Sequence, residues 1–588
     1  MHLPGFFDTA FSVYDAVLEW LVPILWSTVT FVTMLTLGIG FSIWSKFVQY
    51  RALTHGVRVT LGQYDEPDTP GALNHFQALT TALSGTIGLG NIGGVALAVG
   101  IGGPGALFWM WIVGLLGMAI KTLEVALAMM YRDESDPHHP KGGAMYVAWK
   151  GLPTFLGPAF KPLGTILGYL FCLALCVATF TGGNMFQSWN IGDITRTYYG
   201  VPTIYTGVAL AVAVAVVILG GIRRIGQITE KLVPVMCLIY LLGGVAILIV
   251  GAANVPEMLG LIVRSAFSPS EGQGAFLGAS VWFALTTGMK RAVFSNEAGQ
   301  GSSPLAHSAV KTKEPIDEAV VAGIEPFIDT CLVCTLTGLV LLTTSAWNRP
   351  PDGDFTDQPV RIVDGRLIAP ESIDTLQFRG EAAAMPLRAN DQLFLVVEVA
   401  VEGSEGSSQR RKLYGTIVPS KTEQLKLGPV KPEELPFEII WSAPEKGTTL
   451  VGLAEPGVYR DYKGAALTGM AFQRGLGPWA VHIVIVTCWF FAYSTLISWS
   501  YYGELAVRNL LGDWAIRPYQ VVYCAAVVLP CVPGFITTDV ELSRLADLGS
   551  GCMLFANLPI LILMSPVAIK AIHTYFRRVD SGEIKRTH

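Results

Sequence analysis

Apolar runs long enough to cross a lipid bilayer recur along most of this chain. A run of roughly 20 apolar residues spans the hydrocarbon as one helix, and lipid tolerates only helices and closed barrels as spans. These runs are too long for barrel strands. Since 51% of the 588 residues are hydrophobic and only 14% are charged, we predict an all-α polytopic membrane protein. We expect eleven spans, at residues 17–48, 75–101, 104–132, 163–191, 200–221, 229–252, 275–297, 316–347, 478–503, 516–536 and 546–571.

Basic residues predict the orientation of these spans, because Lys and Arg accumulate in cytoplasmic loops. Lys46 follows the first span, Arg132 the third, Arg223 lies between the fifth and sixth, and Arg577 follows the last. The N-terminus is therefore expected outside and the C-terminus inside. No basic segment precedes the first apolar run, so we expect that run to be retained rather than removed as a signal peptide.

A polar segment, residues 348–469, interrupts the apolar pattern between the eighth and ninth expected spans. Its runs FLVVEVAVEG and LYGTIVPS alternate apolar and polar residues, which is typical of strands. We predict a β-rich extracytoplasmic domain inserted at this point; a disordered loop is the alternative. The segment contains no cysteine, and Cys331 and Cys334 are interpreted as packing residues of a span. The role of the insertion, as a cap, an envelope anchor or a partner-docking module, stays open.

The glycine-rich stretch ALSGTIGLGNIGG, residues 82–94, predicts a break inside the second span. Each glycine costs a helix about 1 kcal/mol relative to alanine. Close helix packing through small residues is the alternative, but these glycines do not share one face, and Asn91 adds a polar side chain. A broken helix frees carbonyls for a cation and N–H groups for a carboxylate. Gln77, Thr81, Ser84 and Gly88 follow helical spacing and predict a polar face leading into the break.

A second interrupted helix is expected about five spans later if the chain contains inverted repeats. The seventh span carries Thr286, Thr287 and Gly288 at mid-depth and has a polar, glycine-rich exit. The predicted organisation is then an extra N-terminal span and two five-span repeats. The expected boundaries are 1–60 for the extra span and its loop, 70–255 for the first repeat, 270–347 and 470–575 for the two parts of the second repeat, 348–469 for the insertion, and 576–588 for a cytoplasmic tail.

Four motifs closely resemble the alanine or glycine:cation symporter family. They are TIGLGNIGGVA at 86–96, GGPGALFWMWIVGLLGM at 102–118, KRAVFSNEAGQGS at 290–302 and FAYSTLISWSYYGE at 491–504. The resemblance covers residues 15–347 and 470–575. It implies a leucine-transporter-like 5+5 inverted repeat, as in the amino acid/polyamine/organocation superfamily. It also implies symport of alanine or glycine with Na⁺, or with H⁺ as a substitute, in the plasma membrane, which in a bacterium is the inner membrane, and no organic cofactor.

The resemblance also assigns site residues. Thr495, Trp499 and Gln187 match the family's substrate pocket, with Asn184 one turn before Gln187. Side chains of the seventh span would close the pocket and restrict it to amino acids with a short side chain. The expected substrate-binding set is Gln77, Thr81, Ser84, Gly88, Asn91, Gln187, Phe283, Thr286, Thr287, Gly288, Met289, Thr495 and Trp499, and the expected Na⁺ ligands are Gly85, Gly88, Ser494 and Thr495. Leu89 departs from the family pattern, where a polar Thr is common.

Charged residues in the spans have less direct interpretations. Lys121, Glu124 and Glu297 are expected to form gate or structural ion pairs rather than to couple transport directly. Trp282 is expected to pack, and the His pair of DPHHP, at 138–139, to lie in a solvated loop without metal.

Motifs typical of other functional classes are absent from this sequence. HExxH, GxSxG and GxxxxGK[ST] are absent, which argues against an embedded enzyme or an ATP-driven pump. An H⁺-coupled symporter, an ion channel and a non-transporting amino acid sensor remain the alternatives. Expected partners are a small neutral amino acid and membrane lipid, with a possible envelope protein at the insertion and no nucleic acid.

Overall fold

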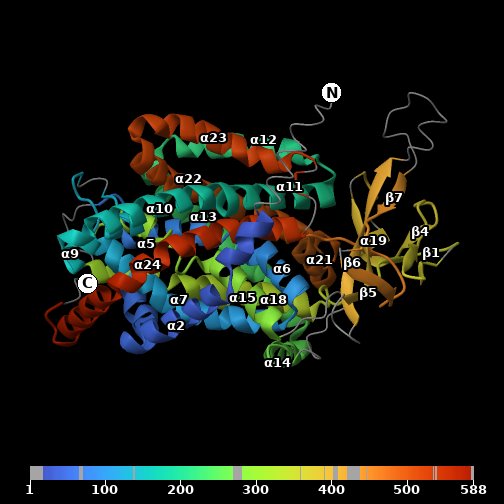
Figure 1. Cartoon of the computed structure of the whole chain (residues 1–588), viewed down its shortest axis with the longest axis horizontal. Helices are drawn as coiled ribbons and strands as arrows, with labels where there is room; N and C mark the ends of the chain where they lie inside the picture. The colour runs from blue at the N-terminus through green and yellow to red at the C-terminus, as the bar shows by residue number, and fades with distance from the viewer. Residues whose placement is uncertain are drawn as a thin grey trace.

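The computed structural model describes residues 18–584 apart from 65–70, 137–139, 269–280, 402–407, 420–436, 445–446, 537–538 and positions 358, 384, 390 and 534. It is a bundle of long helices with a group of strands at one end (Figure 1). Within the described residues seven helices are long and apolar enough to cross a membrane: Leu18–Trp44, Gly105–Met130, Pro158–Tyr199, Gly221–Val250, Pro315–Thr343, Pro478–Leu511 and Glu541–Asp580.

The remaining expected spans correspond to shorter or interrupted helices. Helices α5 (His75–Thr86) and α6 (Val95–Gly102) flank a break, and the pair counts as an eighth span if it is taken as one. Helices α12 (Thr203–Ile218), α15 (Val281–Asn296) and α23 (Ile516–Val528) occupy three other expected positions. Each of these three is shorter than 18 residues in the part described, so the count of eleven spans stays a prediction.

The long helices differ in how much of their surface is buried inside the bundle. Helix α7 (Gly105–Met130) is buried along most of its length and packs against α15 and α17 (Pro315–Ala322). Helix α13 (Gly221–Val250) instead leaves Leu238, Leu242 and Ile249 exposed by 58–70%. An apolar face of this kind is stable against lipid and not against water.

Nine further helices of the described bundle complete the framework around α7. Their bounds are α2 (Thr28–Trp44), α10 (Lys161–Phe180), α11 (Phe186–Tyr199), α14 (Val255–Ser265), α16 (Pro304–His307), α18 (Thr335–Thr343), α21 (Ala465–Leu476), α22 (Val481–Leu511) and α24 (Asp539–Asp580). Three wide helical turns join some of them: η2 (Gly90–Gly94), η5 (Thr181–Met185) and η7 (Phe327–Cys334).

The break after α5 lies inside the glycine-rich stretch, as the sequence predicts. Helix α5 starts with a capping box in which Asn74 and Gln77 bond each other's backbone N–H groups at 2.7 and 3.1 Å. It ends at Thr86, and the chain resumes as η2 and α6 with a bend of 49°. Glycine tolerates this departure because it has a low helix propensity and no side chain to accommodate.

A second unwound segment follows α15 rather than lying in its middle. Helix α15 is continuous through Thr286–Gly288, and the backbone leaves the helix only after Asn296. Residues Glu297, Gly299 and Gly301 then adopt left-handed φ angles of 58°, 87° and 75°. Two of these three positions are glycines, for which this conformation costs little. The chain becomes helical again at α16.

Strands occupy residues between 353 and 460, where the sequence predicts a β-rich segment. The larger sheet is antiparallel with order β7-β6-β5-β8, and β9 also pairs with β5. Leu393, Leu395, Val397 and Val399 alternate along β5 and form its buried core face. The bounds are β1 (Gly353–Phe355), β2 (Arg361–Val363), β3 (Arg366–Ile368), β4 (Leu376–Phe378), β5 (Gln392–Val401), β6 (Ser408–Pro419), β7 (Phe437–Trp441), β8 (Thr448–Leu453) and β9 (Tyr459–Arg460).

The β-rich region is bonded to the helices by buried and half-buried charges. Arg196 of α11 pairs with Asp391 at 2.9 Å, and Arg388 donates to the carbonyl of Arg196. Arg349, which follows α18, donates to the carbonyl of Arg460 at 2.6 Å. These contacts join the region to two helices; its status as a separate, extracytoplasmic domain stays a prediction.

Candidate functional site

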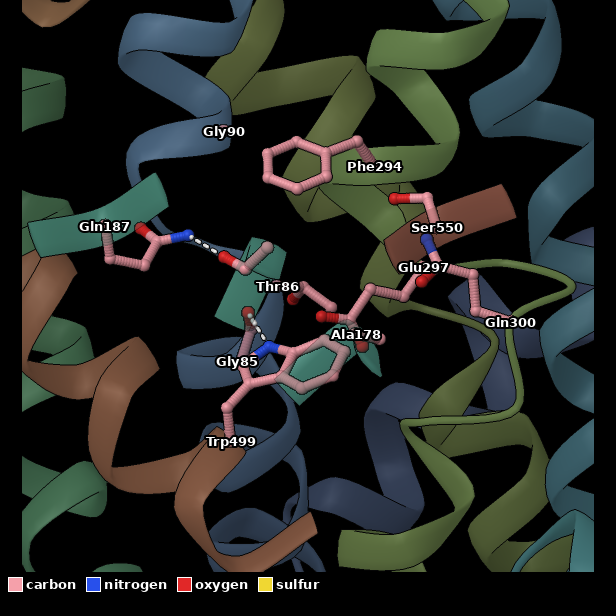
Figure 2. Close-up of a pocket in the computed structure, with 11 residues that line it drawn as sticks. Gly85, Thr86, Gly90, Ala178, Gln187, Phe294, Glu297, Gln300, Trp499 and Ser550 are labelled. Carbon is pink, nitrogen blue, oxygen red and sulfur yellow. Dashed lines mark hydrogen bonds between the residues drawn. The ribbon is translucent and has the colours of Figure 1, made fainter. Parts of the chain in front are cut away.

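A small cavity lies beside the break that follows α5. Its volume of about 20 Å³ is roughly the space of one water molecule. Its lining comes from both broken segments and from α10, η5, α11, α22 and α24 (Figure 2). The lining residues are Gly85, Thr86, Gly90, Ala178, Gly182, Gln187, Phe294, Glu297, Gln300, Trp499 and Ser550.

Two backbone N–H groups at the break are held by side-chain oxygens. Gly88 N–H donates to Asn91 Oδ1, and Leu89 N–H donates to Gln187 Oε1, each at 3.0 Å. The Gln187 amide donates in turn to the carbonyl of Gly182 at 2.9 Å. N–H groups at the start of a helical segment attract anions. A carboxylate that displaced the two amide oxygens would therefore meet donors already directed toward it.

The orientation of Asn91 depends on a buried carboxylate. Asn91 Nδ2 donates to Asp329 Oδ1 at 2.6 Å, so its carbonyl oxygen is the atom left for Gly88. Ser295 and Thr330 also donate to Asp329, each at 2.8 Å. Asp329 lies on η7 and is fully buried, and it was absent from the residues expected from the sequence.

Oxygen atoms of α5 and α22 meet on the other side of the break. Thr495 Oγ1 donates to the carbonyl of Ser84 at 2.9 Å, and Trp499 Nε1 donates to the carbonyl of Gly85 at 3.2 Å. Ser84 Oγ lies 3.3 Å from the carbonyl of Ser494, and Ser498 Oγ lies 3.3 Å from that of Thr81. Carbonyl and hydroxyl oxygens are the ligands that hard cations prefer.

Most of the expected site residues are brought together at the break, although Thr81 contributes only its carbonyl, because its hydroxyl contacts Thr229 of α13. A side chain at Gly88 would not fit, because a Cβ atom would lie 2.5 Å from Thr495 Oγ1 and 3.1 Å from Gln187 Oε1. Ser494 Oγ itself donates to its own helix, at 2.9 Å from the carbonyl of Phe491. The residues gathered at the break are Thr81, Ser84, Gly85, Gly88, Asn91, Gln187, Ser494, Thr495 and Trp499.

Gln77 does not reach the cavity. Its side chain caps α5 and donates to Glu230 Oε2 at 2.8 Å. Asn184, which was expected near the pocket, donates to the carbonyl of Tyr523 at 2.9 Å and does not line the cavity.

The residues expected from the seventh span also lie elsewhere. Phe283 and Thr287 line a separate cavity, and Thr286 Oγ1 donates to the carbonyl of Phe283 in its own helix at 3.2 Å. Gly288 packs against α7, where a Cβ would lie 2.3 Å from the carbonyl oxygen of Ala106. Met289 is buried but does not line the cavity. The expected positions precede the actual break, which begins at Glu297.

The residues of this region that do line the cavity are Phe294, Glu297 and Gln300. They belong to KRAVFSNEAGQGS, a motif on which the family resemblance rests, so the sequence contained a signal for them. Its two closely spaced glycines mark the unwound segment better than the single Gly288. Ser550 of α24 had no such signal.

A buried charge network lies near the second unwound segment and consists of Lys121, Glu325, His307, Glu318 and His75. Lys121 Nζ lies 2.6 Å from Glu325 Oε2, which agrees with the structural pairing expected for this lysine. The two ring nitrogens of His307 contact Glu318 and Glu325, and His75 also contacts Glu318. Burial lowers the pKa of His307, but the two carboxylates outweigh it and raise that pKa to about 9.

Three other expectations concern single side chains. Glu124 accepts a hydrogen bond from the Asn557 amide at 2.5 Å, and no basic side chain of the described residues forms an ion pair with it. Trp282 packs edge-on against Phe31, with ring centroids 6.0 Å apart. The two histidines at 138–139 lie outside the described residues.

The sequence of this chain is similar to those of known proteins. The model of the sodium:alanine symporter family matches residues 11–360 and 447–588. The sodium/alanine symporter AgcS of Methanococcus maripaludis is 32% identical over 95% of this chain and 97% of its own length. A protein of Bacillus subtilis named as a probable sodium/glutamine symporter, GlnT, is 33% identical over 56% of this chain and 65% of its own length. The crystal structure of MhsT in complex with L-phenylalanine overlaps 86% of this chain and 99% of its own, with 13% identity and a TM-score of 0.46.

Proposed function

The chain belongs to the sodium:alanine symporter family, and we propose that it transports alanine or glycine together with Na⁺ by alternating access. The family consists of symporters and not of enzymes, and the chain is accordingly a cation-coupled, multi-pass amino acid transporter. One observation carries the finer proposal. The N–H groups of Gly88 and Leu89 are held by the oxygens of Asn91 and of the cavity-lining Gln187, at the same break where Thr495 of α22 donates to the carbonyl of Ser84.

In the proposed complex the substrate carboxylate binds the Gly88 and Leu89 N–H groups. It replaces the oxygens of Asn91 and Gln187, which then turn toward the rest of the substrate. The cavity of about 20 Å³ is smaller than any amino acid, so Phe294 and Trp499 must move for the substrate to bind. The movement required of these side chains grows with substrate size. Alanine or glycine is therefore favoured over glutamine, the amino acid in the name of the relative GlnT.

Na⁺ is proposed to bind between α5 and α22. The expected ligands include carbonyls near Gly85 and Gly88 and the oxygens of Ser494 and Thr495. The carbonyls of Ser84 and Thr81 and the hydroxyl of Ser498 lie in the same cluster. Ion and substrate would then stabilise the same broken helix. A coupling free energy of about 1 to 3 kcal/mol between the two sites would raise the affinity for each roughly 5- to 150-fold.

Alternating access is proposed to move the two broken segments relative to the rest of the bundle. The predicted orientation places the N-terminus and the β-rich region outside and the C-terminus in the cytoplasm, in the plasma membrane. The contacts of Arg196 and Arg349 with the β-rich region would make that region move with α11 and α18.

Uptake into proteoliposomes tests the proposal. Labelled alanine and glycine are supplied outside, with an inward Na⁺ gradient in one sample and K⁺ in place of Na⁺ in another. We expect saturable uptake that requires Na⁺. Uptake that instead follows an inward H⁺ gradient would contradict the assignment of the oxygens between α5 and α22 to Na⁺. Uptake of glutamine, without alanine or glycine, would contradict the proposed substrates.

A further inference from the structure

The Glu297 carboxylate is an acidic group in the cavity lining. It lies just after the last residue of α15 and is 2% exposed. Its side chain points into the cavity, between Thr86 and the indole of Trp499 (Figure 2). Gln187 lines the same cavity next to the break. A carboxylate is therefore present where the proposed substrate would bind.

No cation of the described chain neutralises this carboxylate at close range. Ser302 Oγ donates to Glu297 Oε2, but within the described residues no Lys, Arg or His nitrogen lies within 4.0 Å of Glu297. Lys121, whose charge acts on Glu297 through space, is bonded to Glu325 and to the carbonyl of Asn296, and the nearby Lys290 and Arg291 pair with Asp547. A buried carboxylate without a cation is unfavourable. A ligand that brought a positive charge into the cavity would remove this cost.

The backbone fixes the position of the side chain. Glu297 adopts a φ of 58°, which is unfavourable for a residue with a side chain. Its N–H donates to the carbonyl of Val293 at 2.9 Å, and its carbonyl accepts from the N–H of Gln300 at 3.0 Å. The Gln300 amide also donates to Val293, at 2.7 Å. These bonds hold the strained residue in place, so the carboxylate is preorganised toward the cavity.

The two ends of the cavity carry opposite electrostatic character. The N–H groups of Gly88 and Leu89, which do not themselves line the cavity, come at the start of η2 between the lining residues Thr86 and Gly90, and they form a positive end once Asn91 Oδ1 and Gln187 Oε1 no longer accept from them. The carboxylate of Glu297 forms a negative end. An α-amino acid carries a carboxylate and an ammonium group separated by one carbon, so a zwitterion matches both ends at once.

We infer that Glu297 binds the α-ammonium group of the substrate. This inference rests on the proposed function and adds a selection rule to it: the transporter accepts zwitterions and rejects small carboxylates that lack the ammonium group. Lactate is the sharpest probe, because it replaces the ammonium of alanine by a hydroxyl and keeps the carboxylate and the methyl group.

The first test uses the wild-type protein in detergent with saturating Na⁺, and it measures displacement of labelled alanine by lactate. Loss of one partner from a buried charge pair lowers affinity by about 30-fold or more. We expect lactate to compete at least that much more weakly than alanine. Lactate that competes within about 3-fold of alanine would overturn the inference, and this result does not depend on any variant folding.

The second test compares Glu297→Gln with a matched control, Glu504→Gln. Glu504 lies on α22, pairs with Arg508 at 3.2 Å and does not line the cavity. We expect Glu297→Gln to lose alanine affinity about 30-fold or more and to reduce the alanine-to-lactate affinity ratio by a similar factor. Glu297→Asp, which keeps the charge, should recover part of the ratio, and Glu504→Gln should leave it unchanged.

The outcomes separate a binding role from a structural one. A structural role would lower the melting temperature of Glu297→Gln but leave the alanine-to-lactate ratio at its wild-type value, and that result would overturn the inference. A wild-type protein that takes up alanine with Na⁺ but fails either test overturns only the role of Glu297. A wild-type protein that neither binds nor takes up alanine overturns the proposed function as well.

Discussion

Replacement of Gly88 by alanine should impair transport by crowding the break. The added Cβ would lie 2.5 Å from Thr495 Oγ1 and 3.1 Å from Gln187 Oε1. Both contacts are too short, so Thr495 must retreat from the carbonyl of Ser84, or Gln187 from the N–H of Leu89. Overpacking of this kind costs about 1 to 3 kcal/mol, which corresponds to a roughly 5- to 150-fold loss of substrate affinity.

The assay is initial-rate uptake of labelled alanine into proteoliposomes as a function of alanine and Na⁺ concentration. Gly94→Ala is the matched control, because it adds the same methyl group at the end of η2, where its nearest neighbour would be Phe294 Cδ1 at 4.0 Å. We expect the Gly94 variant to transport like the wild type at equal protein content. Wild-type KM and rate for Gly88→Ala would refute the placement of the substrate and ion at this break.

Three further predictions concern the ion site and the buried charges. Thr495→Ala should raise the KM for both Na⁺ and alanine in the uptake assay. The matched control is Ser500→Ala, because the Ser500 hydroxyl donates to the carbonyl of Ile497 in its own helix at 2.7 Å, and this variant should change neither KM. Lys121→Met should destabilise the protein by up to about 3 to 5 kcal/mol, because it removes one of the two cations bonded to the buried Glu325 and leaves only His307, and the melting temperature should recover partly when Glu325→Gln is added. The raised pKa of His307 stabilises the folded protein fully below the ordinary His pKa near 6.5, and this stabilisation is lost as pH rises through about 9. The melting temperature of the wild type should therefore fall across this pH interval, and that of His307→Gln should fall less.

Helix positions were the part of the fold that could be predicted most directly. The apolar runs follow from the need to bury backbone polar groups in lipid, and seven of the predicted spans coincide with helices long enough to cross a membrane. The break was predictable as well, because the glycines from Gly85 to Gly94 weaken the helix wherever they lie in the fold. The β-rich region was predictable from alternation, as in Leu393, Leu395 and Val397.

The geometry of the candidate site was predictable only where a motif coincided with a break. Thr495, Trp499 and Gln187 do meet the first broken helix. In the seventh span the predicted residues Thr286 and Gly288 lie too early, because helical propensity alone does not determine where a helix inside a bundle ends. That end depends on which neighbouring groups can bond the released backbone, as Val293 and Gln300 show.

The sequence by itself determined that the chain is a membrane transporter of this family with a helix broken at residues 87–89, since hydropathy and glycine content act locally and the motifs are contiguous. Only the tertiary structure decided which distant groups meet at the break. Asp329 orients Asn91 across 238 positions of sequence, and the left-handed backbone at Glu297 directs a carboxylate into the cavity. Such pairings depend on how helices pack against one another, and packing is a property of the whole bundle that no single segment encodes.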